Sequence, residues 1–227
     1  MKVSWNNDKS GRAGLKAHDL EYLDTHPVVS EFWMDASPAK NWADRAAVAA
    51  ILVFGSHMGG RFNAPFAMSS KVAAAISLFS SNGPIVPTNV TSGAGTLTWP
   101  GGLELALEQD APLGLDRINK LDGTRRIGLN VVRSDLVTGR LFSFDQLTLS
   151  SNAWLHAQQR SVGERMYPFM AVAVLFAADL QISTIICRAD DEVPDRQLAA
   201  LGNLLGSVGL GLEIDRSSDS SAISPRG

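Results

Sequence analysis

Residues 161–188 read SVGERMYPFMAVAVLFAADLQISTIICR, and this stretch determines how we interpret the fold. The part at 161–180 is helix-like, and its long apolar run at 166–180 is typical of a buried helix. The part at 182–188 is rich in β-branched residues and predicts a strand. Further along, 194–205 predicts a second helix and 212–214 a last strand. This alternation of helix and strand indicates a sheet covered by helices.

The middle of the chain has a different pattern. Four segments alternate polar and apolar side chains, as half-buried strands do: 96–99, 103–107, 126–132 and 141–149. Turn sequences separate the first two at 100–102 and the last two at 134–140. Short turns of this composition join antiparallel neighbours. The pattern therefore predicts two hairpins in this region.

Toward the N-terminus, segments 41–54 and 69–79 carry apolar residues at helical spacing. We expect residues 1–90 to form a helical and loop-rich region. Residues 91–216 should form a mixed-sheet α/β region that packs with it as one globular unit. The polar, Ser-rich stretch 217–227 should be a disordered tail. The predicted class is α/β (α+β), with a mixed, largely antiparallel sheet flanked by helices.

The composition restricts the classes of function. Hydrophobic residues make up 45% of the 227 residues, enough for a sizeable core, and the net charge of −3 does not indicate a nucleic-acid partner. The single cysteine excludes an intrachain disulfide, and the four histidines have no paired spacing, so we expect no metal site. No apolar leader or bilayer-spanning run is present. We therefore expect a cytoplasmic protein with no membrane partner.

The first candidate site opens the apolar helix. It consists of Arg160, Ser161, Val162, Gly163, Glu164 and Arg165. Backbone N–H groups at the start of a helix attract anions, and a glycine lets the anion approach closely. A flanking arginine adds charge-assisted hydrogen bonds. The segment therefore predicts a site for a phosphate-bearing ligand.

The order of elements around this loop resembles the C-terminal half of the GCN5-related N-acetyltransferases. That family binds the pyrophosphate of acetyl-CoA on a loop of the form Arg/Gln-x-x-Gly-x-Gly/Ala. Arg160 matches the first position and Gly163 the central glycine. Arg165 departs from the small residue of the last position, and Pro168 interrupts the expected helix. The resemblance covers residues 141–214.

The resemblance implies acetyl-CoA as cofactor and transfer of an acyl group to an amine of a small molecule or a protein. The amine would attack the thioester directly, and the protein would position it and accept its proton. Backbone groups of the strand near Leu149 would hold the cofactor arm. The candidate catalytic residues are Asp145 and His156, and the ordinary pKa of histidine suits a proton acceptor better.

Three further features have simple structural interpretations. The loop Gly55–Gly60, followed by Arg61, lacks the spacing of known phosphate-binding loops, which favours a connecting loop. Cys187 lies in an apolar run and predicts a buried thiol. Trp99 and Trp154 would offer surfaces for base stacking or for a partner if exposed, but buried core tryptophans are commoner.

Two functions of other classes also fit the composition. One is a non-catalytic structural or interaction subunit of a bacterial or phage-encoded assembly, including a homo-oligomer. The low charge, the abundant small residues and the scarcity of motifs agree with it. The other is a single-stranded nucleic-acid or nucleotide binder that uses arginines on an antiparallel sheet.

These hypotheses predict different responses to ligands. An acyltransferase is expected to show a higher Tm with coenzyme A or acetyl-CoA, because a ligand of the native state stabilises it by mass action. A nucleic-acid binder is expected to show a salt-dependent Tm shift with short RNA or DNA. An assembly subunit is expected to show neither shift and to form a defined oligomer, which size-exclusion chromatography measures.

Overall fold

The computed structural model describes residues 1–39, 43–79, 83–92, 101–109, 126–143, 145–188 and 193–215. The strands are β1 (Lys2–Asn7), β2 (Ala13–His18), β3 (Glu31–Met34), β4 (Arg61–Ser69), β5 (Val86–Thr91), β6 (Leu103–Gln109), β7 (Arg126–Arg133), β8 (Arg140–Phe142), β9 (Gln146–Ser151), β10 (Ile182–Arg188) and β11 (Gly211–Asp215). The α-helices are α1 (Ala43–Phe54), α2 (Ser70–Phe79), α3 (Ala153–Ala157), α4 (Tyr167–Phe176) and α5 (Asp195–Ser207), and short 3-10 turns lie at Gly55–His57 and Val162–Glu164.

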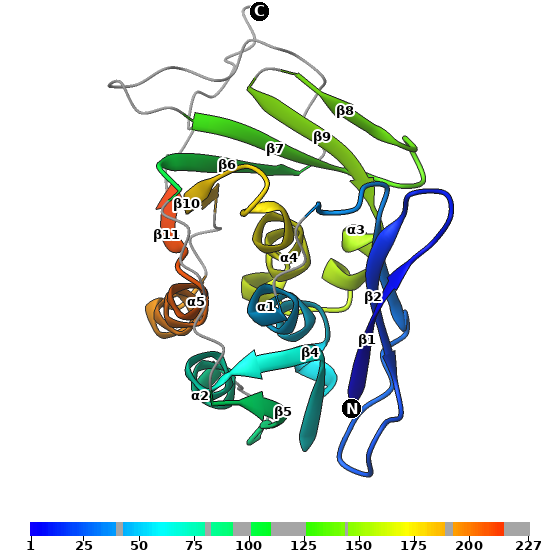
Figure 1. Cartoon of the computed structure of the whole chain (residues 1–227), viewed down its shortest axis with the longest axis vertical. Coiled ribbons are helices and arrows are strands. Elements are labelled where there is room, and N and C mark those ends of the chain that lie inside the picture. Colours follow the sequence, from blue (N-terminus) through cyan, green and yellow to red (C-terminus); the bar gives the residue numbers. More distant parts are fainter. Residues whose placement is uncertain are drawn as a thin grey trace, which may run out of the picture.

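The strands form one sheet in the order β11-β10-β6-β7-β9-β3-β2-β1-β4-β5, with β8 paired to β9. Figure 1 shows that this sheet curves around α1 and α4, so the two helices lie inside it. On the open side of the curve, α2 and α5 lie between the two ends of the sheet (Figure 1). One continuous hydrophobic core connects the sheet with all four of these helices.

Helices α1 and α4 are central because α4 is apolar on every side and α1 is apolar throughout except for Asp44 and Arg45 in its first turn. Every residue of α4 is buried, as is every residue of α1 from Asp44 to Phe54. A helix with no polar face must be enclosed, since any exposed side would leave apolar surface in water. Pro168 lies in the first turn of α4, where its missing N–H has no intrahelical partner. The proline therefore marks a late helix start and does not break the helix.

The predicted class is confirmed: the chain has a mixed α/β fold with helices packed on the sheet. Among the described strands, however, six of the ten pairings are parallel, more than the sequence pattern suggested. Strands β11, β10, β6, β7 and β9 run parallel to one another. The antiparallel pairings are those within the meander of β1, β2 and β3, together with β3–β9 and β8–β9.

Two sequence-based predictions are wrong. The turn at 134–140 does not join antiparallel neighbours, because the short strand β8 forms the hairpin with β9 and lets β9 run parallel to β7. The region 1–90 is not mainly helical and loop-rich, since it holds β1 to β5 besides α1 and α2. Its first hairpin turns at Gly11, whose φ of 88° suits glycine.

Other predictions agree with the structure or fall outside it. The helices expected at 41–54 and 69–79 are α1 and α2, and the strand expected at 182–188 is β10. The expected strand 96–99 and the tail 217–227 lie outside the described residues. Of the helices in the described ranges, none is both long and apolar enough to cross a membrane.

Gly14 on β2 provides a test of the meander. A Cβ atom at this position would lie 1.9 Å from the carbonyl oxygen of Phe32 on β3. We expect Gly14→Ala to lower the free energy of unfolding by roughly 3 kcal/mol, because the strands must separate to relieve the overlap. Urea unfolding measures this, with Gly102→Ala as control, since its Cβ would meet nothing within 4 Å. An equal effect of the two substitutions would contradict the prediction.

Candidate binding surface

The loop expected to hold a pyrophosphate forms a tight turn. Residues Val162–Glu164 are a 3-10 turn, and α4 begins only at Tyr167. The N–H of Glu164 donates to the carbonyl oxygen of Ser161 at 2.9 Å, and that of Arg165 donates to Val162 at 3.3 Å. Two of the amides expected to face an anion therefore already have partners within the turn.

Arg160 points into the protein. Its side chain is 3% exposed, and its Nη2 donates to the carbonyl oxygen of Val53 at 2.6 Å, in the last turn of α1. The guanidinium also lies 5.8 Å from the ring centre of Tyr167 and 4.0 Å from Glu164. A cation in this position stabilises the C-terminal end of a helix. The guanidinium of Arg160 therefore points toward the end of α1 and away from solvent, while its expected role at a pyrophosphate stays a prediction.

Gly163 is covered by a neighbouring helix. A Cβ atom at Gly163 would lie 2.6 Å from Oε1 of Gln197 on α5. The glycine thus allows the turn to pack against α5, and it does not open a path for a ligand. The Nε2 of Gln197 is also 3.5 Å from Glu164, so the turn and α5 are joined by a polar contact.

The two candidate catalytic residues are far apart. Asp145 directly precedes β9, and its carbonyl oxygen accepts a hydrogen bond from the N–H of Gly128. His156 lies on α3, which follows the other end of β9. A six-residue strand spans about 20 Å at its usual rise. Asp145 and His156 therefore do not form one proton-transfer pair.

His156 is buried among aromatic rings. The rings of Phe32 and Phe54 meet it edge-on at 5.7 and 5.5 Å, and its Nε2 is 3.2 Å from the carbonyl oxygen of Glu31. Burial, with a smaller effect from the charge of Arg160, lowers the pKa of His156 to about 4, although the Glu31 carbonyl opposes this shift. A neutral, enclosed imidazole of this kind holds β3 to α3.

The strand near Leu149 has no free edge for a cofactor arm. Leu149 pairs with Val131 of β7 on one side and with Arg140 of β8 on the other. A sheet strand binds an extended ligand through unpaired N–H and C=O groups, and the ladders on both sides occupy these groups here. Leu149 therefore has no unpaired backbone edge at which an extended cofactor arm could add.

The Gly55–Gly60 loop packs against residues 23–25, which lie between β2 and β3. The Nδ1 of His57 lies 3.1 Å from Oγ1 of Thr25, and the N–H of Gly59 donates to Asp24 at 3.0 Å. A Cβ atom at Gly59 would lie 2.0 Å from the carbonyl oxygen of Leu23. These contacts agree with a connecting loop, as the sequence favoured.

Cys187 is buried, as the apolar run predicted. Burial raises the pKa of its thiol to about 12, so the reactive thiolate form is suppressed. In the parts of the chain that the structure describes, no group of three or more His, Cys, Asp or Glu side chains is arranged to hold a metal ion.

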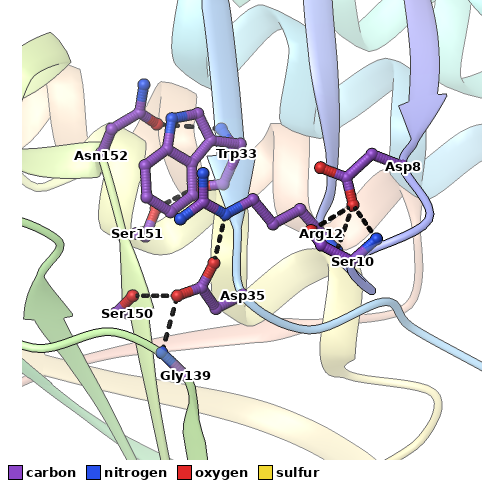
Figure 2. Close-up of polar contacts among 9 residues, drawn as sticks. All are labelled: Asp8, Ser10, Arg12, Trp33, Asp35, Gly139, Ser150, Ser151 and Asn152. Carbon is purple, nitrogen blue, oxygen red and sulfur yellow. Dashed lines mark hydrogen bonds and ion pairs between the residues drawn. The ribbon is translucent and has the colours of Figure 1, made fainter.

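A polar network on the outer side of the meander fixes one arginine, as Figure 2 shows. The guanidinium of Arg12 lies 4.1 Å from the ring centre of Trp33, and its Nε donates to Asp35 at 2.6 Å. Asp35 also accepts hydrogen bonds from the Oγ of Ser150 and the N–H of Gly139. Burial alone would raise the pKa of Asp35, but these donors outweigh it and lower the pKa. The network joins β2, β3 and β9.

A second arginine–tryptophan pair lies at the end of β7. Arg133 is 4.4 Å from the ring centre of Trp154 and forms two hydrogen bonds with Asp135. Both arginines thus carry their own carboxylate partner.

The hollow beside Arg12 measures about 150 Å³, too small for more than a small molecule. Trp99, the other tryptophan considered, lies outside the described residues.

A larger hollow lies between α2 and α5 and has a volume of about 580 Å³. We call it the α2–α5 groove. From α2 it is lined by Lys71, Ala75, Leu78 and Phe79, and from α5 by Arg196, Ala199, Ala200, Gly202, Asn203, Gly206 and Ser207. Leu78 is 84% exposed and lies on the α2 side of this groove.

Each helix of the α2–α5 groove has a second face that the core does not use. The buried residues of α2 are Val72 and Ile76, whereas Ala75 and Leu78 line the groove. The buried positions of α5 include Leu201 and the two leucines after Asn203, whereas small residues at helical spacing line the groove. This small-residue stripe is visible in the sequence, but its exposure is decided by packing.

Comparisons of the chain with models of protein families, with curated proteins and with solved structures find no match. Function must therefore be inferred from the surfaces and contacts of the chain itself. Of these, the α2–α5 groove is the larger of the two hollows described, and its lining includes Leu78, which the core leaves exposed.

The buried position of His156 predicts a pH dependence of stability. The unfolded chain takes up a proton on this residue near pH 6.5, whereas the folded chain does so only near pH 4. Stability is therefore fully present above about pH 6.5 and falls, by about 3 kcal/mol, as the pH drops to about 4. His156→Gln keeps a donor for the Glu31 carbonyl and does not titrate, so its stability should fall less over this range.

Urea unfolding between about pH 4.5 and about pH 7 measures the slope. His26→Gln is the matched control, because His26 is exposed, and it should retain the wild-type slope. If the slope of His156→Gln equals that of the control, His156 is not the group responsible.

Proposed function

We propose that this protein is a non-catalytic binding subunit that holds a helical segment of a partner protein in the α2–α5 groove. The observation that supports this most directly is the groove itself, a hollow of about 580 Å³ between two helices with Leu78 exposed on its wall. Grooves between helices that combine apolar walls with a few polar groups are common binding sites. The proposal keeps the interaction-subunit hypothesis that the composition allowed.

A helix suits the α2–α5 groove better than an extended peptide does. The groove runs between two packed helices, and a third helix can lay a ridge of side chains into such a furrow. Gly202 and Gly206 on α5 support this, because a Cβ at either position would meet nothing within 4 Å. Two glycines reduce the helix propensity of α5 by about 1 kcal/mol each relative to alanine. They also leave room for another backbone to approach closely.

The buried ionisable groups favour a structural role over a catalytic one. Arg160 caps α1, His156 is enclosed by aromatic rings, and Cys187 is a buried thiol. None of these three lines the hollow beside Arg12 or the α2–α5 groove. The acyltransferase hypothesis stays a prediction for the ligand experiment below, and the contacts of Arg160 and Leu149 argue against it.

A nucleic-acid role has less support than a protein partner. The Arg12–Trp33 and Arg133–Trp154 pairs supply aromatic surfaces of the kind that stack on bases. Each arginine is, however, neutralised by Asp35 or Asp135. Binding to a phosphate backbone depends on an excess of positive charge, which these pairs do not provide.

We expect acetyl-CoA to leave the Tm unchanged, because the guanidinium of Arg160 and the amides of Glu164 and Arg165 already have hydrogen-bond partners within the protein. Differential scanning fluorimetry over a range of acetyl-CoA concentrations measures this, with an unrelated CoA-binding protein as positive control. A saturable rise in Tm would support the acyltransferase hypothesis and oppose a non-catalytic role.

Synthetic helices test the α2–α5 groove directly. At least one of a set of amphipathic peptides of about 18 residues, long enough to form a helix, should shift the backbone NMR resonances of α2 and α5. Burying Leu78 is worth about 2 kcal/mol, so Leu78→Asp should weaken binding about thirtyfold. Leu136→Asp, at another exposed leucine in the turn after β7, should not weaken it.

The outcome is decisive for the binding role. If none of the acidic, neutral or basic peptides shifts resonances of α2 and α5, the proposed function is wrong. Binding that Leu136→Asp weakens as strongly as Leu78→Asp would place the peptide elsewhere and would also contradict the proposal.

A further inference from the structure

Among the residues that the structure describes, the charged side chains lining the α2–α5 groove are both positive. Lys71 and Arg196 are the charged residues that line it, and both are exposed. Across the described ranges, neither side chain forms an ion pair with a carboxylate. Lys71 instead donates to the carbonyl oxygen of Gly206 at 3.2 Å, which keeps its ammonium group at the end of α5. The groove is therefore apolar along its length and positive at its rim.

The two cations lie at opposite ends of the α2–α5 groove. The contact of Lys71 with Gly206 joins the start of α2 to the end of α5, so the helices run antiparallel. Arg196 is in the first turn of α5. Ten residues separate Arg196 from Gly206, and a helix rises about 1.5 Å per residue, so the two positive ends are about 15 Å apart.

We propose that the partner of the α2–α5 groove is an acidic amphipathic helix with two carboxylate side chains on one face, about seven to eleven residues apart. Positions seven or eleven apart lie on the same face of a helix, about 10 to 17 Å from one another. One carboxylate then reaches Lys71 and the other Arg196, while apolar side chains between them contact Leu78. This inference rests on the proposed function and names the chemistry of the partner.

A second copy of this chain fits the groove less well. A two-fold interface brings the same surface patch of both copies together. Each copy would then present Lys71 and Arg196 to the other copy's Lys71 and Arg196 across an apolar contact. Like charges opposed in this way disfavour association. The charge of the rim therefore favours a partner of opposite sign over self-association.

Exposed ion pairs contribute little individually, so the inference concerns selectivity. One such pair changes affinity by about two- to fivefold, and two pairs by about tenfold. Opposite charge also speeds encounter at low salt. The apolar contact supplies most of the affinity, and the two cations select the sign of the partner.

The experiment uses the full chain and three synthetic helices with the same leucine face. They differ only in the two flanking positions, which are Glu, Gln or Lys. In low salt, isothermal titration should give an affinity about tenfold higher for the Glu peptide than for the Gln peptide, and lowest for the Lys peptide. The difference should shrink at about 0.5 M salt, since salt screens exposed charges.

Charge-reversed variants locate the preference. The double variant Lys71→Glu, Arg196→Glu should prefer the Lys peptide, whereas the control Lys9→Glu, Arg140→Glu, with the same net charge at other exposed sites, should keep the wild-type order. The neutral double variant Lys71→Gln, Arg196→Gln should bind the Glu and Gln peptides equally well. It replaces the charge-reversed variant if that one does not fold. Circular dichroism checks the folding of each variant.

The outcomes separate this inference from the proposed function. If the Gln or Lys peptide binds as tightly as the Glu peptide, and Leu78→Asp still weakens it, the groove binds helices but the acidic partner is wrong. If the preference for Glu survives in the reversed or neutralised variant, the role of Lys71 and Arg196 is wrong. If no peptide binds, the proposed function fails and this inference fails with it.

Discussion

The burial of two helices with no polar face is the constraint on which the rest of the structure depends. Every residue of α4 and nearly every residue of α1 is shielded from water, so the chain must cover them on all sides. One sheet achieves this by curving around both helices (Figure 1). Exposing either helix would return a large apolar area to water. This costs a free energy of roughly 25 cal/mol for each Å² exposed.

The same constraint explains why a groove exists on the outside. A curved sheet that does not close on itself leaves an opening, and α2 and α5 fill it between β5 and β11. Each uses one face to complete the core, and their outer faces meet along a line of small residues. Ala75 and Gly202 leave space there that larger side chains would fill. The groove is thus a consequence of how the core is closed, and its positive rim is a separate property of Lys71 and Arg196.

Polar side chains in this protein mainly join segments that are distant in the sequence. Arg160 ties the turn before α4 to the last turn of α1 through the Val53 carbonyl. Asp35 accepts hydrogen bonds from Arg12 just before β2, from Ser150 on β9 and from Gly139 in the turn before β8. Each of these side chains supplies a hydrogen-bond partner to a buried group. A buried donor or acceptor without a partner destabilises the fold by about 1–3 kcal/mol. Their contacts account for residues that a sequence alone would assign to catalysis.

The sequence by itself determined the local elements whose signal is strong. Apolar spacing identified α1 and α2, and the β-branched run identified β10, because side-chain periodicity follows directly from helix and strand geometry. Only the tertiary structure decided that β9 runs parallel to β7, that Arg160 points inward, and that Asp145 and His156 lie at opposite ends of a strand. These depend on contacts between residues far apart in the chain. The α2–α5 groove is of the same kind, since a row of small residues is visible in the sequence but its exposure depends on which helix faces the core packing selects.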